Sequence, residues 1–234
     1  DLLHVLEMPA LHELRRLLGG SETELAQRVE TQAHEALQQL AGEIEQQHGV
    51  RSQIRLMRGP MVGAITERAR QTNAAMLVVG ANSAAVLRHW LLGATADRLL
   101  RTSTQPMLFV RLMPHEDYRR VLVPVDFSAC ATAALALARA TAPQAQILLQ
   151  HVCALPFEGK MRFAGVTEAQ LLQYRQQARR DAQARLQALA DEAGLAPQQW
   201  TPVVTQGDPG RDILTQQVER DVDLVVLGKH GAGM

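Results

Sequence analysis

Hydrophobic and polar positions follow two spacings that alternate along the chain. Short aliphatic runs of strand length are followed by longer stretches in which apolar residues recur every three or four positions, as on one face of a helix. In the first half this predicts strands at 2–6, 53–57, 75–79 and 107–110, and helices at 21–47, through Ile65 and Ala69, and at 84–101. Such alternation is typical of a parallel sheet covered on both faces.

The second half repeats this order of elements. The predicted elements are a strand opening at Val121, a helix at 129–140, a strand at 146–153, a long helix ending near Gly194, a strand at 200–205, a helix at 211–219 and a strand at 222–227. Capping boxes are predicted at Ser21–Glu24 and Thr167–Gln170, each at the start of a long helix. Gly194 suits the position that ends a helix.

An internal repeat relates the two halves. Three residues of the first half match three of the second at a separation of 148 positions: Gly59, Ile65 and Gly80 match Gly207, Ile213 and Gly228. His4-Val5 matches His151-Val152 at 147 positions. On this alignment the first repeat lacks the counterpart of 119–147 and the second lacks the counterpart of 87–111.

The repeat predicts two domains, 1–112 and 119–234, joined by a short polar linker at 112–118. A start at Asp1 rather than Met leads us to expect that the sequence is part of a longer protein. A first domain without its central strand would leave the flanking strands without ladder partners. We therefore expect preceding residues or another segment to fill that place.

Composition narrows the functional class. Lys+Arg and Asp+Glu are both 24, so the formal net charge is zero and no field attracts nucleic acid or an acidic membrane. No apolar run approaches the roughly 18 residues of a membrane span. Cys130 and Cys153 show no zinc-like spacing, and we predict reduced core thiols in a cytoplasmic protein without a metal site.

Candidate chemistry gathers at the ends of two strands in the second repeat. Val121 to Ser128 reads V-L-V-P-V-D-F-S, which puts Asp126 at the carboxyl end of a buried strand, where open parallel sheets bind ligands. The stretch Val225–Gly233 ends in a Gly-rich loop whose backbone N–H groups can approach an anion. Glycines after a strand also form ordinary tight turns, so both interpretations stay open.

The other polar residues near these ends have structural interpretations. Ser128 and Asp208 are predicted as N-caps of the helices that follow them, and His151 as a structural residue. Lys229 and His230 suit a solvated loop, and no Gly-Lys-Ser/Thr makes it a Walker A loop. No catalytic constellation is found, so we predict that the chain is not an enzyme.

These motifs resemble the universal stress protein domain, here in tandem. V-P-V-D-F-S, the strand ending in His-Val, the Gly-x-Pro-like turn before a helix with Ile, and Gly-x-x-Gly carry the resemblance over nearly the whole chain. It implies two doubly wound α/β domains of the adenine nucleotide alpha-hydrolase type, each with a five-stranded parallel sheet in the order 3-2-1-4-5. In one subgroup it also implies an ATP site, with Gly-x-x-Gly, nine residues, then Gly-Ser or Gly-Thr.

Carried over residue by residue, the resemblance implies a nucleotide site in the second domain. The matching positions there are Pro124, Val125, Asp126, Val152, Gly228, Lys229 and Gly231. In the first domain Val5, Gly80 and Gly93 match, but Ser83 replaces the second glycine and Ala94 the hydroxyl residue. We therefore expect ATP, with its accompanying Mg, in the second domain, and a degenerate site in the first.

The resemblance implies a cytosolic stress-response binding or signalling module. Its two repeats would pack as an internal pseudo-dimer, a homodimer is a further expectation, and the protein partner is not predicted. Two alternatives stay open. One is a slow ATP-hydrolysing enzyme on the same fold, although no Ser-Gly-Gly loop follows the first strand of the second repeat. The other is a structural stress adaptor that needs no nucleotide.

Overall fold

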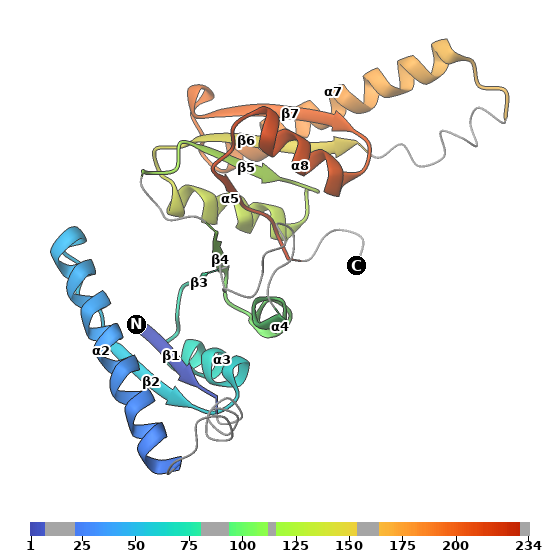
Figure 1. Cartoon of the computed structure of the whole chain (residues 1–234). Coiled ribbons are helices and arrows are strands. Elements are labelled where there is room, and N and C mark those ends of the chain that lie inside the picture. The colour runs from blue at the N-terminus through green and yellow to red at the C-terminus, as the bar shows by residue number, and fades with distance from the viewer. Residues whose placement is uncertain (8–21, 81–93, 112–115, 154–163, 230–234) are drawn as a thin grey trace. The chain divides into compact units, whose positions relative to one another are not determined.

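The chain divides into two compact units, Asp1–Met113 and Pro114–Met234. The structure, a computed structural model, describes residues 1–7, 22–80, 94–111, 116–153 and 164–229 (Figure 1). In both units parallel strands alternate with helices, which confirms the predicted α/β class. Of the described helices, none combines the length and the apolar character that crossing a bilayer requires.

Unit 2 is built on a four-stranded parallel sheet in the order β7-β6-β5-β8. Its strands are β5 (Arg120–Pro124), β6 (Gln146–Cys153), β7 (Trp200–Gln206) and β8 (Leu224–Val225). β5 pairs with β6 on one side, Val123 opposite Leu149, and with β8 on the other, Leu122 opposite Val225. Numbered within the repeat, this order is 3-2-1-4, as the predicted order requires.

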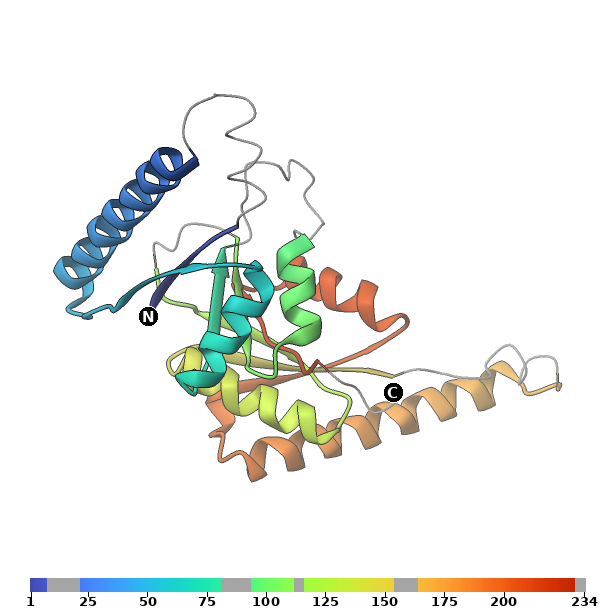
Figure 2. The same cartoon turned by 90° about the horizontal axis from the view of Figure 1, so that it is seen from below.

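Helices cover both faces of this sheet: α5 (Ala129–Thr141), α7 (Glu168–Glu192) and α8 (Pro209–Glu219), with the short 3-10 helix η1 (Pro197–Gln199) before β7. Figure 2 shows α5 and α7 below the sheet and α8 above it. Val121 and Val123 pack with α5 and α7, whereas Leu122 packs on the α8 side, and all three are 0% exposed. A strand buried on both faces explains the continuous aliphatic run.

Both ends of α7 carry the predicted stop and start signals. The Thr167 hydroxyl accepts from the Gln170 amide at 3.3 Å, and the Gln170 side chain accepts from the Thr167 amide at 2.9 Å, so the capping box is confirmed. At the other end Gly194 has φ +66°, and Leu195 N–H donates to the Ala190 carbonyl at 2.9 Å. This is a Schellman end, in which a left-handed glycine closes the helix.

Unit 1 contains two separate pairs of parallel strands. β1 (Leu2–Leu6) pairs with β2 (Ile54–Arg58), and β3 (Leu77–Gly80) pairs with β4 (Met107–Val110). Its helices are α2 (Glu22–His48), α3 (Met61–Gln71) and α4 (Ala94–Thr102); Figure 1 shows α2 and α3 on opposite sides of β1 and β2. The pairs correspond to strands 2-3 and 4-5 of the predicted order, and among the described residues no strand joins them.

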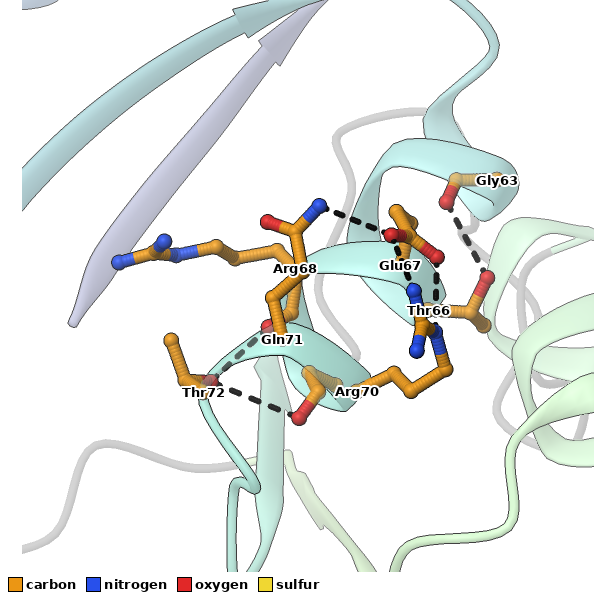
Figure 3. A network of polar contacts seen from close by, with 8 residues as sticks. Gly63, Thr66, Glu67, Arg68, Arg70, Gln71 and Thr72 are labelled. Carbon is orange, nitrogen blue, oxygen red and sulfur yellow. Dashed lines mark hydrogen bonds and ion pairs between the residues drawn. The ribbon is translucent and has the colours of Figure 1, made fainter.

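A polar network covers the outer surface of α3 (Figure 3). Glu67 accepts from Arg70 at 2.7 Å and from Gln71 at 2.8 Å, and the hydrogen bond from Arg70 holds the pKa of Glu67 below its usual value. Arg68 donates to the Asp1 carboxylate through Nε and Nη2, at 2.9 and 2.6 Å, which ties the helix to the start of β1. The Glu67 contacts thus lie within α3, and the Arg68–Asp1 contact joins the helix to β1.

Some predicted boundaries change in the structure. β8 covers only Leu224–Val225, shorter than the predicted 222–227, and pairs with Val121 and Leu122 of β5. Ser21 of the first capping box, positions 84–93 of the predicted helix at 84–101, and 112–115 of the linker lie outside the described residues. The strands at 2–6, 107–110 and 146–153 agree residue for residue.

The two cysteines are free thiols in different surroundings. Cys153, the last residue of β6, is 6% exposed, and burial raises the pKa of its thiol while Arg179 opposes the shift. Cys130 is half-buried in the first turn of α5. The predicted core position is therefore confirmed for Cys153, whereas Cys130 lies near the carboxyl edge of the sheet.

Candidate functional site

The site is built on the turn that follows β5. Pro124 ends the strand, and the Val125 amide still donates to the Gln150 carbonyl of β6 at 2.8 Å. Asp126 then projects as an exposed residue before Ser128, the N-cap position of α5. The chain order strand, carboxylate, helix therefore puts Asp126 at the carboxyl edge of the sheet, on its central strand.

The Asp126 carboxylate organises this turn. Its Oδ1 accepts from the Ser128 amide at 3.0 Å and from the Ser128 hydroxyl at 2.6 Å. This is an Asx-type turn in which a side chain replaces a backbone acceptor. Ser128 holds the predicted N-cap position, but its side chain bonds to Asp126 and makes no capping hydrogen bond to α5. Asp126 thus has a structural function as well as an accessible charge.

Phe127, between these two residues, has the left-handed conformation with φ +62°. Its ring lies 4.5 Å from the His151 ring of β6, tilted by 41°, and 3.8 Å below the guanidinium carbon of Arg185 on α7. His151 Nδ1 is 2.8 Å from the Val125 carbonyl, and because a carbonyl only accepts, Nδ1 donates. The predicted structural interpretation of His151 agrees with this contact.

Gly228 brings the loop after β8 to the same edge. A Cβ added at Gly228 would lie 2.8 Å from the Cβ of Cys130 and 3.2 Å from its carbonyl carbon and oxygen. Only glycine allows the backbone to pass so close to the first turn of α5. The glycine therefore has a packing reason of its own, and it places the loop beside the N-terminus of α5.

The remaining predicted site residues of unit 2 divide between core and surface. Val125 is 5% exposed and its side chain belongs to the core with α5 and α7, so only its backbone faces the edge. Pro124 and Val152 are half-buried at the ends of β5 and β6, and Lys229 is exposed after Gly228. Gly231 lies outside the described residues.

The corresponding positions of unit 1 do not form the same arrangement. Val5 is buried near the end of β1, and Gly80 ends β3 with no atom within 4 Å of an added Cβ. Ala94 is the exposed first residue of α4. Ser83 and Gly93 lie outside the described residues. Among the described residues, Gly80 thus has no close contact with a helix like that of Gly228 with α5.

Possible metal ligands and cavities elsewhere in the described residues were compared with this edge of the sheet. Within the described ranges, no group of three His, Cys, Asp or Glu side chains could hold a metal ion. A cavity of about 390 Å³ lies at the opposite, amino edge of the sheet, where Ile147 and Leu195 line it. Its Arg139 already donates to the Ala193 carbonyl at the end of α7.

Comparison with known proteins places the chain in a family. The universal stress protein family model matches residues 1–111 and, again, 117–234. The chain belongs to the universal stress protein family. It carries two universal stress protein domains in tandem, which confirms the resemblance drawn from the motifs. No match is found among curated proteins.

Solved structures show the same fold. A universal stress protein from Archaeoglobus fulgidus DSM 4304 is 19% identical, with a TM-score of 0.66 over 95% of this chain and 73% of that one. A protein from Pseudomonas aeruginosa UCBPP-PA14, described as a universal stress protein, is 14% identical, with a TM-score of 0.58 over 97% of this chain and 81% of that one. At these identities the similarity shows the fold alone.

Sequence reasoning singled out Asp126 and Gly228, which the structure places at one edge of the sheet, but it missed the contacts of Phe127 and Arg185. Phe127 stands inside the motif, yet nothing in the one-dimensional pattern marks it as left-handed. Arg185 is one of several arginines on a long amphipathic helix, and no spacing relates it to the turn after β5. Only the packing of α7 on β5 and β6 brings them together.

Proposed function

We propose that unit 2 binds an adenine nucleotide, ATP with its Mg, at the carboxyl edge of its sheet. One observation carries the proposal. Asp126 follows β5, the central strand between β6 and β8, where the strand order reverses, and Gly228 brings the neighbouring loop to the first turn of α5. In doubly wound sheets the crevice at this reversal is where ligands bind.

The residues present suit the two ends of a nucleotide. The exposed Asp126 carboxylate can accept from ribose hydroxyls, and the half-buried Pro124 and Val152 offer apolar surface for a base. Backbone N–H groups at the start of α5, next to the Gly228 loop, favour an anionic phosphate. Among the described residues of unit 1 no atom lies within 4 Å of a Cβ added at Gly80, and Ala94 has no hydroxyl, so we propose one site per chain.

Isothermal titration of the full chain with MgATP tests the proposal. We expect micromolar affinity with one site per chain, loss of detectable binding in Asp126→Ala, and weakened binding in Asp126→Asn. The asparagine variant is the matched control, because its carbonyl oxygen can still accept from the Ser128 amide while the charge is gone. Unchanged affinity in Asp126→Ala, or two equal sites, would contradict the assignment.

We propose a binding or signalling module in the stress response rather than an enzyme. The Ser128 hydroxyl donates to the Asp126 carboxylate and His151 Nδ1 donates to the Val125 carbonyl. The hydroxyl and the imidazole next to the site therefore stabilise the turn after β5. Incubation with ATP should therefore release no phosphate or pyrophosphate above background. Acid extracts of the purified full chain should contain nucleotide if the protein is such a module, and none if it is an adaptor that needs no ligand.

The tandem arrangement supports two further parts of the proposal. Two domains of one family in one chain can pair as an internal pseudo-dimer, and light scattering of the full chain distinguishes a monomer of this kind from a homodimer of whole chains. The two free thiols suit a reducing cytosol.

A further inference from the structure

Phe127 combines an unusual backbone conformation with ring contacts from two side chains elsewhere in unit 2. We propose that Arg185, Phe127 and His151 form a positioning stack that fixes the orientation of the Asp126 carboxylate and thereby sets the nucleotide affinity of unit 2. This inference rests on the proposed function, and it assigns Arg185, a residue of α7, to the site. None of the three side chains needs to touch the ligand.

The first step is the backbone of Phe127. Its φ of +62° lies in the left-handed region, which bulky residues other than glycine rarely adopt. Such a conformation persists only where the surrounding structure holds it. The contacts that hold Phe127 must therefore offset the strain.

The second step is the stack itself. The Arg185 guanidinium carbon lies 3.8 Å from the centre of the Phe127 ring, within the range of a cation–π contact. The His151 ring contacts the same ring at 4.5 Å and is fixed by its 2.8 Å hydrogen bond to the Val125 carbonyl. Phe127 also packs against the buried core of α5 and α7. Three elements thus converge on one ring.

The third step links the ring to the carboxylate. Asp126 precedes Phe127 and Ser128 follows it, and the Ser128 amide and hydroxyl both donate to Asp126 Oδ1. A return of Phe127 to negative φ would turn the Ser128 amide away from Oδ1, because the two groups flank that rotation. The stack therefore holds the turn, and the turn holds the carboxylate.

Arg185 suits this task because the ring is its specific partner. Within the described part of the chain, Arg185 makes no hydrogen bond or ion pair, and its guanidinium lies over the Phe127 ring. Replacing Arg185 should therefore disturb the stack without breaking a salt bridge.

The decisive experiment compares two substitutions of Phe127 in the full chain. Phe127→Ala removes the ring but keeps a Cβ at positive φ, so the turn relaxes and MgATP affinity falls about tenfold. Phe127→Gly also removes the ring, but glycine adopts positive φ freely, so affinity stays within about threefold of wild type. Thermal melts of both variants check that unit 2 remains folded. Equal loss of affinity in the two variants would overturn the positioning function.

Arg185 is tested in both backgrounds. Arg185→Gln should weaken MgATP binding severalfold when Phe127 is present and have no effect when residue 127 is glycine, since the stack is already gone. The same loss in both backgrounds would mean that Arg185 acts independently of Phe127, contrary to the proposal.

A measurement without nucleotide keeps this inference separate from the proposed function. Hydrogen exchange of the Ser128 amide should be faster in Phe127→Ala than in wild type and protected again in Phe127→Gly. If wild type binds no nucleotide, the proposed function fails while the exchange rates still test the stack. Equal protection of the Ser128 amide in wild type and Phe127→Ala would refute the positioning stack.

Discussion

The two units share one order of elements but differ at the place of the central strand. In unit 2, β5 has a neighbour on each side and three residues that are 0% exposed. In unit 1 the described strands form two pairs, and of its described residues only Leu99 is 0% exposed, whereas Val5 and Leu6 in β1 are 7% and 6% exposed. The comparison teaches that in unit 2 the central strand supplies fully buried core residues as well as the turn that carries Asp126.

Surfaces differ between the repeats as well. On α8, Leu214 and Val218 are 48% and 74% exposed, whereas the equivalent positions of α3 are Thr66 and Arg70. Thr66 donates to the Val62 carbonyl at 2.9 Å and Arg70 bonds to Glu67. Equivalent helices therefore use polar contacts in one unit and leave aliphatic side chains exposed in the other.

The largest expected effect tests burial beside the central strand. Leu149→Ala in β6 removes a side chain that is 0% exposed next to β5, and it should destabilise unit 2 by about 3 kcal/mol. The equivalent Leu2→Ala in β1, where the side chain is half-buried, should cost about 1 kcal/mol. Unit-resolved hydrogen exchange of the full chain measures both. Equal losses would remove the distinction between the repeats.

The next effect tests the two equivalent glycines. Gly228→Ala places a methyl group 2.8 Å from the Cys130 Cβ, which should destabilise unit 2 by about 2 kcal/mol. Gly80→Ala meets no atom within 4 Å and should change the stability of unit 1 by less than about 0.5 kcal/mol. Denaturant unfolding of each variant measures the difference. Cys130→Gly should partly restore the stability of the Gly228→Ala variant, because it removes the Cβ at residue 130 that the new methyl group meets. Cys130→Ala keeps this Cβ and should not restore it.

The smallest effect tests the surface of α3. Because the pKa of Glu67 is lowered in the folded state, its ionised form stabilises unit 1 above the ordinary carboxyl pKa, and this contribution is lost as pH falls through the folded value. Thermal melts of wild type and Glu67→Gln should therefore differ slightly at pH 7 and converge at low pH or high salt. A difference that grows on acidification would contradict the ion pair with Arg70.

Strands, helix caps and strand order could be predicted from sequence patterns, whereas most contacts of the candidate site could not. The strand at 146–153 was predictable because an aliphatic run stands between polar residues, and the cap at Thr167 because its partner is three residues away. The contact of Gly228 with Cys130 joins residues far apart in the chain, and a glycine expected beside phosphate also serves helix packing. Contacts that depend on how the helices pack on the sheet join residues distant in sequence, so no local sequence pattern predicts them.

The pairing of β5 with β8 bears on the order in which unit 2 forms. Val121 pairs with Leu224, and Asp223 accepts from the Arg119 and Arg120 amides at 2.6 and 2.9 Å. Parallel strands so distant in sequence close late, since loop entropy must be overcome before they pair. During synthesis, β5, β6 and β7 emerge and can pair before β8 leaves the ribosome. The pairing that brings Gly228 to the edge with Asp126 therefore forms after the β7-β6-β5 part of the sheet.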